Sequence, residues 1–202
     1  MVKLLFAGSL ILLVSGCRGE PAGTNVSFVE ARVDETQSPL PFVIALANSG
    51  AAETDVDGVS IDVVDGMVVS HPNGITDNGK PATVTTGDCR IEMREGHPTE
   101  IAARGDGVAC GFVTWERPQE APPAVAAVSA RFRVKLADGA TIETPPRVFF
   151  LSSTTGMAKL ALEELTLDRD EAAALLARIE SLPGERTDNV DRMIERLRTL
   201  AK

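Results

Sequence analysis

The sequence lacks tyrosine altogether and contains a single tryptophan, so aromatic residues make up only 4% of its 202 residues. A base-stacking surface or an aromatic sugar-binding strip would have few side chains to use. Basic residues are also few: 20 Lys and Arg stand against 29 Asp and Glu, which gives a formal net charge of −9. A surface that neutralises phosphate backbones is therefore not expected, and nucleic acid is excluded as a partner.

Residues for acid–base or nucleophilic chemistry are equally sparse. The two histidines, His71 and His97, each precede a proline in turn-like sequence, where we expect solvent-exposed loops. The sequence has no Gly-x-Ser-x-Gly elbow, phosphate-binding glycine loop, metalloprotease helix or nucleotide fingerprint. We therefore predict a protein that is not an enzyme and uses no cofactor or metal. A hydrolase assembled from distant residues is the less favoured alternative.

The first sixteen residues have the composition of a secretory signal. A basic start, Met1-Val2-Lys3, precedes residues 4–16, which carry no charge. These thirteen residues would span about 20 Å as a helix, short of the ~30 Å hydrocarbon core of a bilayer. We interpret residues 1–16 as a signal peptide rather than a membrane span.

The signal ends in Val14-Ser15-Gly16-Cys17, and this segment resembles the lipobox of bacterial lipoproteins. The resemblance implies that the Cys17 sulfur carries a diacylglyceryl group and that signal peptidase II cuts before Cys17. Residues 17–24 would then form a lipidated tether, and two or three acyl chains would anchor it stably to the membrane. An ordinary signal peptide with an incidental cysteine is the alternative.

The residue after the cysteine bears on location. Arg18 stands where an aspartate tends to retain lipoproteins of this class in the inner membrane. The resemblance therefore implies the outer membrane, facing the periplasm, if the host is Gram-negative.

Two further cysteines remain, Cys89 and Cys110. Since an exported protein folds in an oxidising compartment, we predict a disulfide between them. Free thiols are one alternative. A metal site that joins Cys89 and Cys110 to His97, with or without His71, is another, although its spacing matches no zinc pattern.

Residues 25–156 predict an antiparallel β-sandwich, immunoglobulin-like in architecture only, because short strands alternate with turn signals. Residues 108–115 predict a central strand, with Cys110 and Phe112 on one face and Trp115 on the other. Two x-Asp-Gly segments, 64–66 and 137–139, each predict a hairpin with a three-residue loop. In the second, Val134 should pair with Ile142 and Arg133 with Glu143, because this register matches both faces.

Residues 157–202 predict a C-terminal α-helical hairpin. A capping box at Asp168–Glu171 precedes one helix, Leu182-Pro183-Gly184 ends it, and Thr187 can cap a second. The apolar stripes comprise Leu175, Leu176, Ile179, Val190, Ile194 and Leu197.

An acidic run, residues 53–65, contains Glu53, Asp55, Asp57, Asp62 and Asp65 without a base. Calcium prefers such oxygen ligands, but strand-surface and turn positions explain Asp62 and Asp65 better. We interpret the run as solvated charge, with a calcium site as the alternative.

Taken together, these patterns predict a lipid-anchored cell-envelope protein that acts as a non-catalytic binding or assembly module. The alternative is an accessory subunit that docks on a larger envelope complex, an envelope protein partner, through its C-terminal helices. Burial of the helical stripes within the same chain would favour the first function, and their exposure the second.

Overall fold

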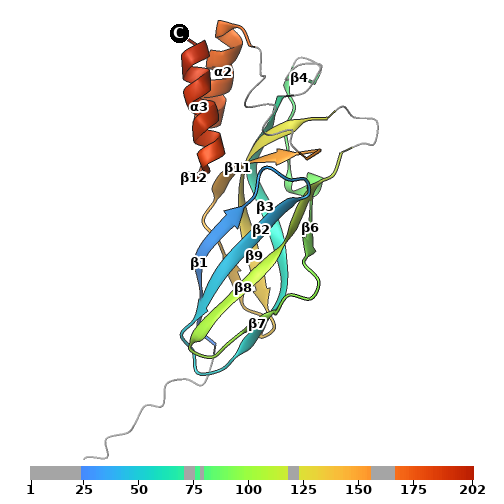
Figure 1. Ribbon diagram of the computed structural model, residues 1–202, viewed down its shortest axis with the longest axis vertical. Coiled ribbons are helices and arrows are strands. Elements are labelled where there is room, and N and C mark those ends of the chain that lie inside the picture. Colours follow the sequence, from blue (N-terminus) through green and yellow to red (C-terminus); the bar gives the residue numbers. More distant parts are fainter. Residues whose placement is uncertain (1–23, 71–75, 78–79, 118–122, 156–166) are drawn as a thin grey trace, which may run out of the picture.

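The protein folds as an antiparallel β-sandwich with two C-terminal helices, as the sequence predicts (Figure 1). The structure is a computed structural model, and it describes residues 24–70, 76–77, 80–117, 123–155 and 167–202. Within this part of the chain, no helix is both long and apolar enough to cross a membrane.

One layer is a four-stranded antiparallel sheet. Its strands are, in order across the sheet, β1 (Val26–Val33), β2 (Leu40–Asn48), β8 (Gly105–Trp115) and β6 (Cys89–Met93). The strand predicted over 108–115 therefore lies in the interior of a sheet, between β2 and β6, as expected.

The other layer is a six-stranded sheet. Its strands are, in order, β12 (Glu185–Arg186), β11 (Arg147–Ser152), β9 (Val125–Leu136), β3 (Thr54–Ser70) and β7 (Glu100–Ile101), with β10 (Thr141–Glu143) beside β9. The smaller elements are β4 (Thr76–Asp77), β5 (Lys80–Pro81) and a 3₁₀ turn η1 (Thr86–Asp88).

Alternating side chains fill the space between the two sheets. In β2 the residues Leu40, Phe42, Ile44 and Leu46 point inward and are almost fully buried, while the residues between them point outward. The Phe42 and Phe132 rings lie 5.0 Å apart between centroids, which joins the two sheets at the centre of the core. Period-two alternation thus produces the main core.

The hairpin around residues 137–139 is confirmed. Val134 pairs with Ile142 and Arg133 with Glu143, and Gly139 adopts a φ of +87°, which a side chain would disfavour.

The hairpin predicted around residues 64–66 is wrong. β3 continues from Thr54 to Ser70 and pairs with β9 along its length, with a bulge between Val63 and Asp65. A Cβ on Gly66 would lie 3.0 Å from the Val84 carbonyl oxygen and from Val128. The glycine therefore serves close packing inside a long bulged strand rather than a chain reversal.

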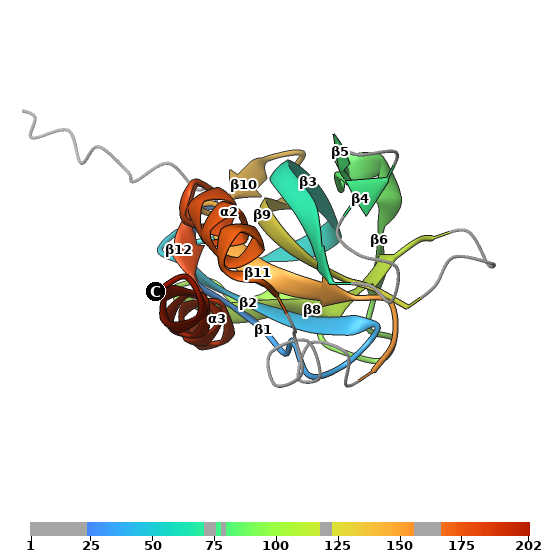
Figure 2. The ribbon, with the colours of Figure 1, turned by 90° about the horizontal axis from the view of Figure 1, so that it is seen from above.

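The C-terminal hairpin consists of α2 (Arg169–Glu180) and α3 (Asp188–Leu200), which lie against the outer face of the six-stranded sheet (Figure 2). The predicted capping box is present, since Asp168 accepts from the Glu171 amide and Glu171 accepts from the Asp168 amide. The segment between the helices contains β12, which pairs in parallel with β11.

Five of the six stripe residues are buried, and Leu176 is half-buried. They pack, together with Met193, on a second apolar cluster from the sheet that comprises Met67, Val69, Val125, Ala127, Val148 and Phe150. The helices therefore cover their own sheet, and no fully exposed stripe remains on them for a partner.

The outward residues of β9 show where this cover ends. Val125 and Ala127 lie under the helices, and the Ser129 hydroxyl donates to the Pro183 carbonyl in the turn between them. Beyond that point Arg131 and Arg133 project from the same face into charged pairs. One strand face thus changes from apolar to charged where the hairpin stops.

A buried carboxylate joins the sandwich to the hairpin. Glu35, in the connection between β1 and β2, is 4% exposed. It accepts from the Phe150 amide on β11 at 2.6 Å, from the Thr187 hydroxyl at 3.0 Å and from the Asn189 side-chain amide at 2.7 Å. Thr187 and Asn189 stand at the start of α3, where a negative charge is favoured by the helix dipole.

Burial raises the pKa of the Glu35 carboxyl above its ordinary value of about 4.5, although the three donors and nearby Arg192 act to lower it. A raised folded-state pKa means that the folded protein holds this proton more tightly than the unfolded chain. The resulting stability is fully present below pH 4.5 and is lost as the pH rises through the folded-state value.

We therefore predict that Glu35→Gln removes this part of the pH dependence of the free energy of unfolding. Denaturant unfolding from pH 4 to 8 should show the wild type losing stability relative to Glu35→Gln as the pH rises. The exposed Glu53→Gln is the control. Parallel wild-type and Glu35→Gln profiles, or an opposite slope, would contradict the prediction.

Candidate functional site

The residues singled out in the sequence do not come together. Cys17 and His71 lie outside the described residues. His97 is exposed in the segment before β7, whereas Cys89 packs against the core between the sheets. Among the described residues, no group of three metal-ligating side chains gathers in one place.

The predicted Cys89–Cys110 disulfide is absent, and both thiols are free. Cys89 pairs across β6 and β8 with Trp115, which lies five residues beyond Cys110 on β8. Because successive residues of a strand point to opposite faces, Cys110 projects from the face opposite Cys89. A sheet therefore separates the two sulfur atoms, and the sequence prediction missed the register that places them so.

The acidic run extends from just before β3 along that strand, and three of its carboxylates contact bases. Asp57 lies 2.5 Å from the Lys135 ammonium, Asp62 contacts Arg131 and Arg133, and Asp65 lies 2.5 Å from Arg178 on α2. These carboxylates point to neighbouring side chains rather than converging on one point, unlike the ligands of a calcium site.

An apolar surface instead lies on the outer face of the four-stranded sheet. Strand register aligns its residues in rows: Ala45 is opposite Val108, Val43 opposite Cys110, and Pro41 opposite Phe112. Val29 stands at the β1 bulge beside Ala45. We call this surface the open face, defined by Val29, Pro41, Val43, Ala45, Val108 and Phe112.

The valines of the open face are unusually exposed. Val29 is 57% exposed, Val43 45% and Val108 39%. Where the six-stranded sheet is not covered by helices, its outer face carries ion pairs such as Arg133–Glu143 at 2.8 Å. Since a contiguous exposed apolar surface usually marks a binding site, the open face is the candidate functional site.

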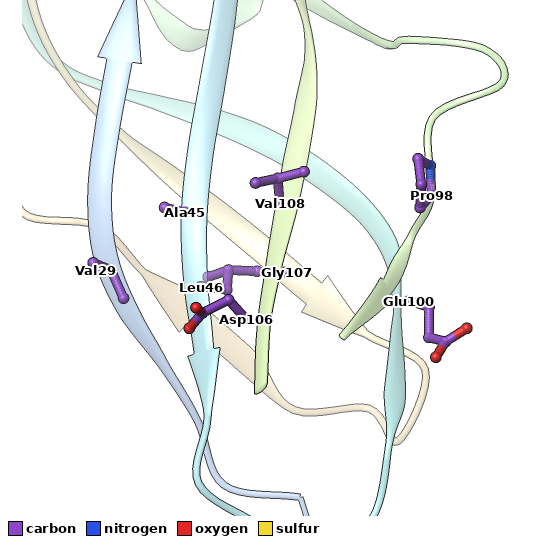
Figure 3. Close-up of a pocket in the computed structure, with 8 residues that line it drawn as sticks. All are labelled: Val29, Ala45, Leu46, Pro98, Glu100, Asp106, Gly107 and Val108. Carbon is purple, nitrogen blue, oxygen red and sulfur yellow. The ribbon is translucent and has the colours of Figure 1, made fainter. Parts of the chain in front are cut away.

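A groove of about 440 Å³ runs along one end of the open face. Figure 3 shows Val29, Ala45 and Val108 side by side on three neighbouring strands, with Pro98 across from β8. Its charged lining residues are two carboxylates, Glu100 and Asp106. The groove is therefore apolar along its strands and acidic at its margin.

Part of the open face can be recognised from the sequence. The apolar run from Pro41 to Ala47 predicts a strand, and the period of two along a strand places Val43 and Ala45 on one face. It does not show that this face stays uncovered, because that depends on where the distant helices pack.

Comparisons with known proteins identify no family. No family model matches the chain, and no curated protein matches it. Among solved structures, the chain is similar to an archaellum periplasmic stator protein complex, FlaF and FlaG, from Sulfolobus acidocaldarius. The sequence identity is 9% and the TM-score 0.29, and the match covers 71% of this chain and all of that one.

The thiols give a direct test of the register. Burial, with a smaller contribution from Asp88, raises the pKa of the Cys89 thiol to about 12, so it should resist alkylation in the folded protein. After unfolding without reductant, both Cys89 and Cys110 should be alkylated, as read by peptide mapping. A cross-linked peptide pair containing both residues would contradict the structure.

Proposed function

We propose that the protein is a lipid-anchored, non-catalytic binding module of the bacterial cell envelope. The observation that carries the binding role is the open face, an uncovered apolar surface on a domain whose helical stripes are otherwise used within the chain. The anchor is supported by the resemblance of Val14–Cys17 to a lipobox, and Arg18 favours the outer membrane, facing the periplasm, in a Gram-negative host.

The chemistry of the open face defines the occupant. Exposed valines provide apolar contact, and burying one such side chain contributes about 1.5–3 kcal/mol. Glu100 and Asp106 favour a basic residue beside the apolar segment by charge complementarity. The occupant is therefore an apolar segment of an envelope protein that carries a flanking lysine or arginine.

The arrangement leaves this face accessible in an anchored protein. Strand β1 begins at the end of the molecule opposite the helices, and β1, β2 and β8, which carry the open face, run between the two ends (Figure 1). A tether of residues 17–24 would reach at most about 28 Å. The domain would thus present its side, rather than its hairpin, to neighbours close to the membrane.

The docking role predicts position-specific crosslinking in cells. A photoreactive residue at 43 or 108 should form an adduct with an envelope protein, and Val29→Asp in the same chain should reduce that adduct at least about tenfold. Photoreactive residues at 57 and 135, on the charged face of the other sheet, are the matched controls.

An unchanged unfolding midpoint would show that Val29→Asp leaves the fold intact, as its exposure leads us to expect. Equal adducts from the control positions, or an adduct mapped to an acidic segment of the partner, would contradict the docking role.

The anchor predicts that Cys17→Ser moves the protein from the membrane fraction to the soluble or unprocessed fraction. Mass spectrometry of the wild type should find a mature amino terminus at a lipid-modified Cys17. Cys110→Ser is the control and should stay in the membrane fraction. A mature wild-type protein with an unmodified Cys17 would refute lipidation while leaving the docking role intact.

A further inference from the structure

A second hollow lies where the sandwich meets the hairpin. This junction cleft has a volume of about 380 Å³. Unlike the groove of the open face, it is lined mainly by polar and charged side chains. They are Arg32, Glu35, Arg147, Glu185, Arg186, Thr187, Asp188, Asn189 and Arg192, with Val33.

Four arginines line the junction cleft of a protein whose net charge is −9. Arg32 is bound to Glu30 at 2.7 Å, and Arg147 lies 3.9 Å from the largely exposed Glu185. The hydrogen bonds of the other two are to neutral oxygens, and Arg192 also interacts electrostatically with Glu35. Arg186 donates to the Glu180 carbonyl at 3.2 Å, and Arg192 to the Asn189 side-chain oxygen at 2.5 Å.

The acids of the junction cleft oppose this charge only in part. The Glu35 carboxylate is already held by its three donors, and Glu185 is 78% exposed, so solvent screens its charge. Asp188 stands at the first residue of α3, where it interacts with the start of the helix. Four arginines thus line the junction cleft with three carboxylates, and no ion pair within 4 Å involves Arg186 or Arg192 among the described residues.

Two buried hydrogen-bond donors without an acceptor are a second observation in favour of an anion. The Nε atoms of Arg147 and Arg186 are fully buried, yet neither has a hydrogen-bond acceptor among the described residues. Buried donors are rarely left unpaired, and a missing ion or water is a common reason. Two arginines of the junction cleft carry such atoms, as does Arg131 on the outer face of the six-stranded sheet.

We propose that the junction cleft binds a small soluble oxyanion, a phosphate or a carboxylate, through Arg186 and Arg192. Guanidinium groups pair with both anions through parallel N–H···O bonds. The elements that line the junction cleft include the end of β1, β12 and the start of α3, and they lie away from the start of β1 (Figure 1). This site does not depend on the docking role of the open face.

The test is calorimetric titration of the detergent-solubilised full-length protein with sodium phosphate and with sodium acetate. Sodium chloride at equal ionic strength is the reference. We expect phosphate or acetate to bind measurably beyond chloride, and Arg186→Gln/Arg192→Gln to weaken binding at least about tenfold. The control Arg133→Gln, on the charged outer face, should bind as the wild type does.

Two further measurements keep the outcome decisive. Arg192→Lys retains the positive charge and should recover part of the affinity, which a purely structural role of Arg192 would not predict. Micelles with and without phosphatidylglycerol test a lipid headgroup as the source. Heats equal to those of chloride, equal weakening in Arg133→Gln, or binding to phosphatidylglycerol micelles alone would overturn the proposal.

Discussion

The arrangement of the molecule depends on the attachment of the helical hairpin to one outer face of the sandwich, and Glu35 is the polar centre of that attachment. Its carboxylate satisfies the Phe150 amide at the sheet edge and two donors at the start of α3. Around it, apolar residues from the sheet and both helices form a second core. Because an unpaired buried donor is costly, removing the carboxylate would weaken both the sheet edge and the helix start.

This attachment decides which surfaces face solvent. The six-stranded sheet is covered by helices at one end and carries ion pairs at the other, so neither end offers an apolar surface. The four-stranded sheet has no helix on its outer face among the described residues, and Val29, Val43 and Val108 stay exposed there. Because the helical stripes cover one sheet, the outer face of the opposite sheet stays uncovered and apolar, as the proposed binding role requires.

Features set by local sequence could be predicted, and those set by distant pairing could not. Asp168 capped its helix as expected, and the turn at Gly139 fixed the register of its hairpin. The Asp65-Gly66 pair carries the same turn signal, but pairing with β9 keeps β3 extended there. The predicted disulfide between Cys89 and Cys110 was wrong for the same reason. Only the register of β6 on β8 shows that the two residues lie on opposite faces of the sheet. Glu35 carries no local sign of burial, since its partners lie more than a hundred residues away.

Methionine oxidation measures the docking of the hairpin most directly. Met193 on α3 and Met67 on β3 are 0% and 3% exposed in the interface between helices and sheet, whereas Met93 on β6 is half-buried outside that interface. Treatment of the full-length protein with dilute peroxide, followed by peptide mass spectrometry, should oxidise Met93 well before Met67 and Met193. Oxidation of Met193 as fast as in the unfolded chain would show that the hairpin is not docked on the sheet, and would contradict this arrangement of covered and open faces.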